Sequence, residues 1–316
     1  MNAVFLDYDT VSMGDLDTSA LRRIMPALKL LEDVSESRIA AHLADAEIVL
    51  INRLALSRER LLGAPRLKLI ALAATGTDNV DLSAAQQLGI AVCNVRRYCT
   101  ASVVQLVWGM ILALTHHLAD YRRLAAAGDW RAAQRLPLIQ PMRELAGRRL
   151  GVIGWGELGR AVAKAGAGFG MEVVVANRRG GAPQGGRLDL DEFLRVADVV
   201  SLHCPLSDGN RGMIGARELS LMKPDALLIN TARGALIDGR ALAEALKSHR
   251  LGGAGIDVLA VEPPAADEPL LDPDIPNLLL TPHMGWAARE ARQRCLDEMA
   301  ANIRDFMAGK RRGRVV

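Results

Sequence analysis

Four polar residues in the second half of the chain have side chains suited to anion binding and proton transfer: Arg233, Asp257, Glu262 and His283. Each follows an apolar run typical of a buried strand, and ligands of open α/β sheets bind at the carboxyl ends of strands. An arginine can hold a carboxylate, a histidine can deliver a proton near neutral pH, and a glutamate can orient and charge that histidine. Any one of the four alone would more often be structural. Together they favour hydride transfer to a 2-oxo acid.

A glycine-rich turn in the middle of the chain has the G-x-G-x-x-G pattern of a dinucleotide-binding loop. It directly follows a strand-like run and opens a helical pattern, which is the context that gives the pattern meaning. The glycines permit a tight turn, a close approach to a pyrophosphate and close packing of the helix, whose N-terminus favours phosphate. A carboxylate beside the expected pyrophosphate is electrostatically unfavourable, so Glu157 fits the pattern only if its carboxylate points outward. The loop residues are Gly154, Trp155, Gly156, Glu157, Leu158 and Gly159.

The end of the next strand-like run bears on the choice of dinucleotide. An NAD site usually places Asp or Glu about 20 residues after the glycine loop, but here Asn177 is followed by Arg178 and Arg179. Arginine matches a 2′-phosphate, so this segment favours NADP as the cofactor, with NAD as the alternative. The competing interpretation is a solvated loop that leads into the glycine-rich residues 180–186.

Composition excludes several other classes of protein. The 316 residues are 50% hydrophobic and 24% charged with a net charge of +3, as expected for about two globular domains. Few aromatics (3%) and no basic block beyond residues 310–312 argue against a nucleic-acid partner. The four cysteines lack metal-ligand spacing, so no metal site is predicted, and they indicate a reducing compartment. Without a signal peptide or a membrane-length apolar run, we expect a cytoplasmic protein with no membrane partner.

Short, continuously apolar runs alternate with helical patterns along nearly the whole chain, which predicts doubly wound parallel sheets of the α/β class. Two longer helical patterns, at about residues 100–127 and 287–308, interrupt this alternation. We therefore expect an inserted domain over residues 100–284, with residues 1–99 and 285–316 forming the other domain. The expected strands are residues 4–7, 48–51, 68–73, 90–94, 150–154, 172–176, 199–203, 226–230, 254–258 and 278–281.

These motifs together resemble the D-isomer-specific 2-hydroxyacid dehydrogenase family, in particular its glycerate dehydrogenase and hydroxypyruvate (glyoxylate) reductase branch. The resemblance extends over essentially the full chain and implies a Rossmann cofactor domain inserted into a flavodoxin-like substrate domain. It also implies a homodimer that reduces a small 2-oxo acid to the D-2-hydroxy acid. The segments that carry it are residues 74–81, 154–159, 203–206, 230–234, 255–263 and 281–287.

The resemblance also implies roles for individual residues. Arg233 would bind the substrate carboxylate, His283 would protonate the carbonyl oxygen, and Glu262 would hold and charge His283. Further substrate contacts would come from backbone N–H groups and from an aromatic side chain that closes the pocket, at Thr75, Gly76, Thr77 and Trp286. Further cofactor contacts beyond the glycine loop would come from His203, Cys204, Pro205, Thr231, Ala232, Asp257 and Gly285.

Two features leave the substrate open. Arg96 and Arg97 stand where relatives commonly carry Pro-Gly, so they either attract an acidic substrate tail or are simply solvated. Gln105 replaces a frequent Glu, as in the glycerate dehydrogenase branch. A D-lactate dehydrogenase or a broad 2-ketoacid reductase remains an alternative, as does a non-catalytic, dinucleotide-sensing corepressor on the same fold.

Overall fold

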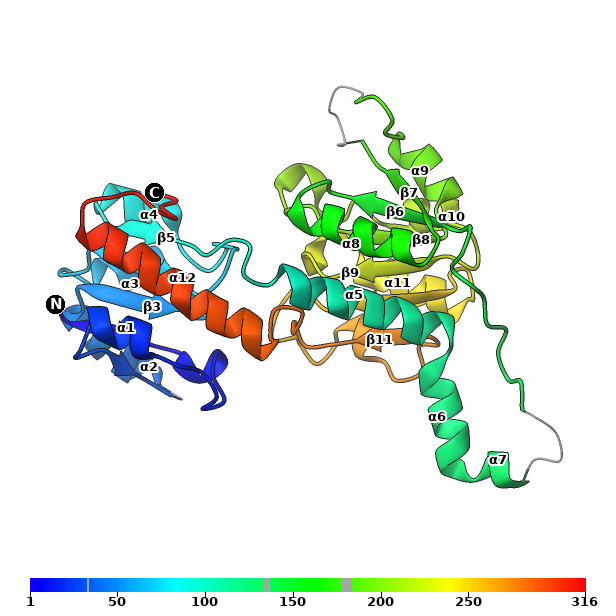
Figure 1. Ribbon diagram of the computed structural model, residues 1–316, viewed down its shortest axis with the longest axis horizontal. Helices are drawn as coiled ribbons and strands as arrows, with labels where there is room; N and C mark the ends of the chain where they lie inside the picture. The colour runs from blue at the N-terminus through cyan, green and yellow to red at the C-terminus, as the bar shows by residue number, and fades with distance from the viewer. Residues whose placement is uncertain (33, 133–136, 178–183) are drawn as a thin grey trace. The chain divides into compact units, whose positions relative to one another are not determined.

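The computed structural model describes residues 1–32, 34–132, 137–177 and 184–316, and the chain divides into two compact units (Figure 1). Met1–Cys99 and Trp286–Val316 form the first unit, and Thr100–Gly285 forms the second. In the part of the chain that the structure describes, all neighbouring strands of both sheets pair in parallel, which confirms the predicted α/β class with two parallel sheets.

The first unit is built on a five-stranded sheet in the order β2-β1-β3-β4-β5. This is the flavodoxin-like order, in which the direction of winding reverses between β1 and β3. The short second strand was not predicted from the sequence. The strands are β1 (Ala3–Phe5), β2 (Lys29–Leu30), β3 (Ile48–Ile51), β4 (Leu69–Leu72) and β5 (Ala91–Cys93).

Both faces of this sheet are covered, which explains why its strands are continuously apolar rather than alternating. Successive side chains of a strand point to opposite faces. In β3, Ile48 and Leu50 therefore pack in one core with the helices Ser19–Ile24 (α1) and Arg289–Met307 (α12). Val49 and Ile51 pack in a second core with the helices Glu36–Asp45 (α2), Arg58–Leu62 (α3) and Leu82–Gln87 (α4). All four β3 side chains are fully buried.

The second unit has a six-stranded sheet in the order β11-β10-β9-β8-β6-β7. An isolated parallel bridge between Ala176 and Leu188 adds one more pairing beyond β7. The order of winding reverses between β6 and β8, and a crevice for a dinucleotide is expected outside the carboxyl ends of these two strands. The strands are β6 (Arg149–Ile153), β7 (Glu172–Val175), β8 (Val199–Leu202), β9 (Leu227–Asn230), β10 (Gly253–Ile256) and β11 (Leu278–Leu280).

The predicted single helix over residues 100–127 is wrong, because it is two helices that meet at an angle of 59°. His117, between them, has a left-handed backbone with φ 49°, which ends the first helix.

The α-helices of the first unit are α1 (Ser19–Ile24), α2 (Glu36–Asp45), α3 (Arg58–Leu62), α4 (Leu82–Gln87) and α12 (Arg289–Met307). Those of the second are α5 (Thr100–Thr115), α6 (Leu118–Ala127), α7 (Asp129–Ala132), α8 (Glu157–Gly168), α9 (Leu190–Val196), α10 (Ala216–Leu221) and α11 (Gly239–Lys247).

The same pair of helices bears on membrane association. In the part of the chain that the structure describes, no single helix combines the length and apolar character needed to cross a membrane. Helices α5 and α6 pass that test only when taken together as a bent pair. Helix α5 buries six side chains in the second unit, among them Val107 and Ile111, whereas α6 buries none.

Candidate active site

The turn after β11 carries His283, and the loop after β10 carries Glu262. His283 Nδ1 lies 2.6 Å from Glu262 Oε2, and Glu262 Oε1 accepts a hydrogen bond from the Leu259 backbone N–H at 2.9 Å. The carboxylate is thus fixed at both oxygens. Since a carboxylate only accepts, Nδ1 carries the hydrogen of this contact, and Nε2 is the ring nitrogen that can exchange a proton with a ligand. The His283 side chain is one-third exposed.

Asp257 is tied to the same turn. It is only 1% exposed, and its carbonyl accepts from the His283 N–H at 2.7 Å. Its carboxylate accepts from the Thr281 hydroxyl and from the backbone N–H groups of Met284 and Gly285, at 2.6, 2.8 and 2.8 Å. The cofactor contacts predicted for Asp257 and Gly285 therefore fall on residues that already bind each other.

Arg233 lies in the turn that follows β9. The buried Asn230 side chain fixes this turn, because its amide donates to the Arg233 carbonyl at 2.9 Å and accepts from the Ala232 N–H at 3.0 Å. The turn packs directly on the neighbouring loop: a Cβ on Gly234 would lie 2.0 Å from the carbonyl carbon of Leu259. The sequence analysis gave no role to Asn230. A polar residue at the end of a buried strand could have indicated that its side chain holds the following turn.

The structure thus gathers three of the predicted polar residues on adjacent loops of one sheet. The loops follow β9, β10 and β11, which are neighbouring strands. Arg233 supplies a permanent positive charge, Glu262 supplies a fixed negative charge, and His283 supplies a ring that can be neutral or protonated. This arrangement can bind an anion and transfer a proton.

The glycine loop after β6 has the shape that its pattern predicts. Gly154 has φ 101°, and a Cβ there would lie 2.5 Å from the Cys204 backbone nitrogen. A Cβ on Gly159 would lie 2.1 Å from the Gly154 carbonyl oxygen, so the first turn of α8 packs against the loop itself. A Cβ on Gly156 would meet nothing within 4 Å. That side of the loop is open to a ligand, and the amino end of a 12-residue helix begins there.

The discordant Glu157 is accommodated within this unit. The Thr100 hydroxyl, at the start of α5, donates to the Glu157 carboxylate. Trp155 and Leu158 are half-buried in the same loop, and the Trp155 carbonyl accepts from Arg160 at 3.1 Å. The acid therefore has a hydroxyl partner beside the expected phosphate position.

Two residues that were predicted to contact the cofactor have a buried polar atom without a partner within the described residues. One is Nδ1 of His203, whose Nε2 lies 2.8 Å from the Ser201 hydroxyl, and another is the Thr231 hydroxyl. Burial lowers the pKa of His203 to about 4, so its ring is neutral at physiological pH. Burial also raises the pKa of the adjacent Cys204 thiol. Unpartnered buried polar atoms call for a bound group. Together with the open face of the glycine loop, they fit a dinucleotide.

The segment predicted to choose the dinucleotide is described only at its start. The Asn177 amide donates to the Asp189 carboxylate at 3.2 Å, and its oxygen accepts from the Gln184 N–H at 3.1 Å. Arg178 and Arg179 lie outside the described residues. Sequence reasoning did not single out Asp189, which lies 12 positions further along the chain.

In the first unit, residues 75–77 follow β4 and present backbone N–H groups. Among the described residues, none of these three N–H groups donates a hydrogen bond within the protein. Two hydrogen bonds hold the loop against residues 94 and 95. The Thr75 hydroxyl donates to the Val95 carbonyl and the Asn94 amide donates to the Thr75 carbonyl, both at 2.7 Å. A rigid loop with three available N–H groups is suited to an anion.

The remaining predicted substrate residues also lie in the first unit. Trp286 is half-buried and packs against the core beside α12. Arg96 and Arg97 are exposed after β5, and Arg97 has a left-handed backbone with φ 62°. Pro205, in the second unit, is exposed after β8, and Ala232 is half-buried.

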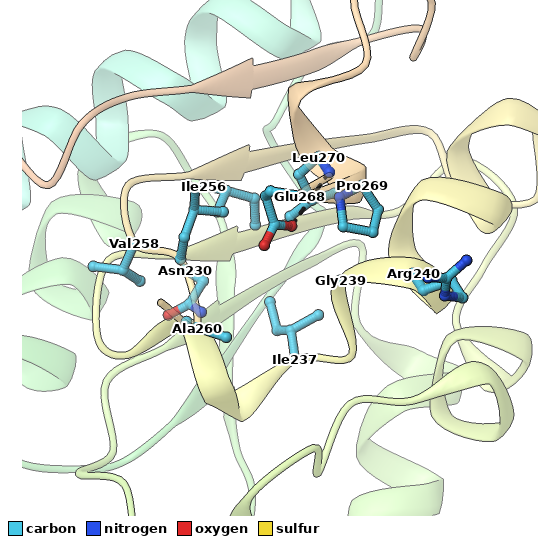
Figure 2. Close-up of a pocket in the computed structure, with 12 residues that line it drawn as sticks. Asn230, Ile237, Gly239, Arg240, Ile256, Val258, Ala260, Glu268, Pro269 and Leu270 are labelled. Atoms are coloured by element: carbon cyan, nitrogen blue, oxygen red, sulfur yellow. Dashed lines mark hydrogen bonds between the residues drawn. The ribbon is translucent and has the colours of Figure 1, made fainter. Parts of the chain in front are cut away.

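A small cavity is lined in part by residues 258–260, which belong to the loop that connects Asp257 to Glu262 (Figure 2). Its volume is about 110 Å³, well below the roughly 300–1,000 Å³ of sites for larger ligands, so it does not hold a dinucleotide. Figure 2 shows the Glu268 carboxylate directed toward its interior. Neither Arg233 nor His283 lines it.

Comparisons with known proteins agree with this geometry. Residues 108–285 match the family model described as "D-isomer specific 2-hydroxyacid dehydrogenase, NAD binding domain". The chain is 43% identical to a glycerate dehydrogenase of Methylorubrum extorquens, over 86% of each chain. The chain belongs to the D-isomer-specific 2-hydroxyacid dehydrogenases. The chain is also 32% identical to a hydroxypyruvate reductase of Blautia hydrogenotrophica, over 98% of each chain.

A solved structure shares the fold of the whole chain. An acyclic imino acid reductase in complex with NADPH and D-Arg superimposes with a TM-score of 0.87 at 26% identity, over the full length of both chains. The predicted family and the predicted oxidoreductase class are therefore confirmed. This 2-hydroxyacid dehydrogenase uses a nicotinamide dinucleotide.

Proposed function

We propose that this 2-hydroxyacid dehydrogenase reduces hydroxypyruvate or glyoxylate to the D-2-hydroxy acid. The observation that carries the proposal is the 2.6 Å contact between His283 Nδ1 and Glu262. It leaves Nε2 as the proton-exchanging atom, in the same sheet whose strand β9 leads into Arg233. The relatives named glycerate dehydrogenase and hydroxypyruvate reductase support this substrate class.

In the proposed reaction each residue has one task. The Arg233 guanidinium holds the substrate carboxylate and polarises the carbonyl group. His283 Nε2 gives its proton to the carbonyl oxygen, and the negative charge of Glu262 stabilises the protonated ring before that transfer. The bound dinucleotide supplies the hydride. In the oxidative direction, His283 accepts the proton.

We also propose that NADPH is the preferred reductant. The support is the sequence Asn177-Arg178-Arg179, in which two guanidinium groups could pair with a 2′-phosphate. Arg178→Ala and Arg179→Ala are expected to raise the KM for NADPH several-fold more than the KM for NADH. Equal changes for both cofactors would refute this proposal.

We propose a homodimer acting in the cytoplasm. Large apolar side chains of α6, α7 and the following described residues are exposed, among them Leu118, Trp130 and Leu138. These apolar side chains would be covered in a dimer that forms through this segment, and light scattering would measure the mass directly. All four cysteines are free, which suits a reducing compartment.

The proposed roles are tested by paired substitutions. His283→Gln and Arg233→Lys are expected to reduce kcat/KM for hydroxypyruvate by at least about 100-fold, while the Kd for NADPH changes little. His249→Gln, at an exposed histidine after α11, is the matched control and is expected to retain wild-type turnover. If both site variants lose NADPH binding in proportion to turnover, the assigned roles are wrong.

A further inference from the structure

The Glu157 carboxylate lies at the amino ends of two helices. Glu157 is the first residue of α8, and its carboxylate accepts a hydrogen bond from the hydroxyl of Thr100, which is the first residue of α5. The amino end of a helix carries a partial positive charge, so a carboxylate is stabilising there. An acid that is unfavourable beside a phosphate therefore has a favourable position with respect to α5.

Helices α5 and α8 pack side by side in the second unit (Figure 1). The Trp108 indole N–H of α5 donates to the Val162 carbonyl of α8 at 3.3 Å, and the Trp108 ring stacks on Phe169 with centroids 4.6 Å apart. A Cβ on Gly166 of α8 would lie 3.2 Å from the Trp108 ring, so the two helices approach closely there. The hydrogen bond from Thr100 to Glu157 thus joins the amino ends of two helices that are also fixed farther along.

The first turn of α5 also binds the segment through which the chain leaves the second unit. The chain enters this unit between Cys99 and Thr100 and leaves it between Gly285 and Trp286. The Ser102 hydroxyl, in the first turn of α5, donates to the Gly285 carbonyl at 2.6 Å. One helical turn therefore contacts the glycine loop through Thr100 and the end of the second unit through Ser102.

We propose that Glu157 is a positioning residue that couples dinucleotide binding at the glycine loop to the order of the first turn of α5. A pyrophosphate at this loop brings negative charge to the amino end of α8, where the Glu157 carboxylate already lies. Like charges repel, so the bound dinucleotide directs this carboxylate toward the Thr100 hydroxyl and strengthens their hydrogen bond. The first turn of α5 is then better ordered when the cofactor is bound. This inference goes beyond the proposed function, because it requires a dinucleotide but no particular 2-oxo acid.

Two substitutions remove the contact from opposite sides. Glu157→Gln keeps the size of the side chain and removes its charge, whereas Thr100→Val keeps the shape of the side chain and removes the hydroxyl donor. The matched controls are Glu244→Gln, at an exposed glutamate of α11, and Thr115→Val, at the last residue of α5.

The experiment is hydrogen–deuterium exchange of the full-length protein, measured by mass spectrometry with and without saturating NADPH or NADH. The amides of residues 104–106 donate to carbonyls of the first turn of α5, so their exchange measures the opening of that turn. In the wild type and both controls, the dinucleotide is expected to slow this exchange about fivefold, which is the lower end of usual coupling between two sites. In Glu157→Gln and Thr100→Val, the slowing is expected to be less than about twofold.

The dinucleotide Kd of the same proteins, measured by fluorescence, completes the test. It should not rise in either variant, because neither substitution removes a group that holds phosphate. Equal slowing of exchange in the wild type and both variants, or no slowing in the wild type, would overturn the proposal. A large rise in Kd in both variants would make Glu157 and Thr100 part of the phosphate site and would overturn it as well.

The design also covers other failures. If Glu157→Gln does not fold, Thr100→Val carries the test, because it is isosteric and leaves the carboxylate in place. If the wild type binds the dinucleotide but reduces no 2-oxo acid, the proposed function fails. The exchange comparison still decides whether Glu157 couples the glycine loop to α5.

Discussion

Glu262→Gln isolates the charge on the residue that contacts His283. The glutamine oxygen can still accept one hydrogen bond, but the amide group must then face either His283 Nδ1–H or the Leu259 N–H, both of which donate to the carboxylate in the wild type. The variant therefore loses the negative charge and one acceptor, with almost no change in volume. Nothing in the glycine loop is altered.

The size of the effect follows from the contact. A hydrogen bond to a charged group contributes about 1.5–3 kcal/mol, and a neutral one about 0.5–1.5 kcal/mol. The difference, about 1–1.5 kcal/mol, is the loss of stabilisation of the protonated His283 ring. Since about 1.4 kcal/mol corresponds to tenfold in rate, a loss of about 1 kcal/mol should lower kcat roughly fivefold. Partial exposure of both side chains, 33% and 25%, keeps the expected loss at the lower end of that range.

The assay is steady-state reduction of hydroxypyruvate at saturating NADPH, with the NADPH Kd measured by fluorescence. Glu262→Gln should show a lower kcat and an unchanged Kd. The control is Glu244→Gln, at an exposed glutamate on α11, which should match the wild type. A kcat within twofold of wild type for Glu262→Gln, or a loss confined to NADPH binding, would refute the reasoning about the His283–Glu262 pair.

Three further predictions concern the cofactor loop and its surroundings. Gly156→Ala should leave the melting temperature unchanged, because its Cβ meets nothing within 4 Å, but should raise the NADPH Kd more than tenfold by occupying the open face of the loop. Gly159→Ala should lower the melting temperature by several degrees, because its Cβ would overlap the Gly154 carbonyl; equal melting temperatures for the two variants would contradict this packing. His203 has a pKa lowered by burial from 6.5 to about 4, so the unfolded chain binds a proton at higher pH than the native protein does. The free energy of unfolding should therefore fall as the pH drops from about 6.5 toward 4, by up to about 3 kcal/mol more than in His203→Gln, as measured by urea titration. Identical pH dependence in the two proteins would show that the ring is not buried as a neutral group.

Much of the fold could be predicted because its physical basis is local. Strand β3 is apolar at every position, as strands buried on both faces must be, and the predicted residues 48–51 agree with it. The failures have tertiary causes. Strand β2 has only two residues, Lys29 and Leu30, and neither is buried, so the sequence has no apolar run that would predict it. The break at His117 depends on one left-handed residue, which helical periodicity does not reveal.

The sequence predicted which side chains make up the candidate site, but it did not predict the hydrogen bonds that hold them in position. Arg233, Glu262 and His283 were identifiable as a set, because side chains suited to anion binding and proton transfer follow three successive strand-like runs. The bonds that hold them run largely to backbone groups: the Asn230 amide to the Arg233 carbonyl, and the Asp257 carboxylate to the turn around His283. Backbone acceptors and donors have no sequence signature, so these supports appeared only in the structure.

The most direct test of the proposed activity is absorbance loss during incubation of the wild-type enzyme with hydroxypyruvate, first with NADPH and then with NADH. We predict turnover with both or with NADPH alone, and a faster rate with NADPH. A rate with NADH alone would contradict the choice of cofactor. No oxidation of either cofactor, with hydroxypyruvate or with glyoxylate, would contradict the proposed activity itself.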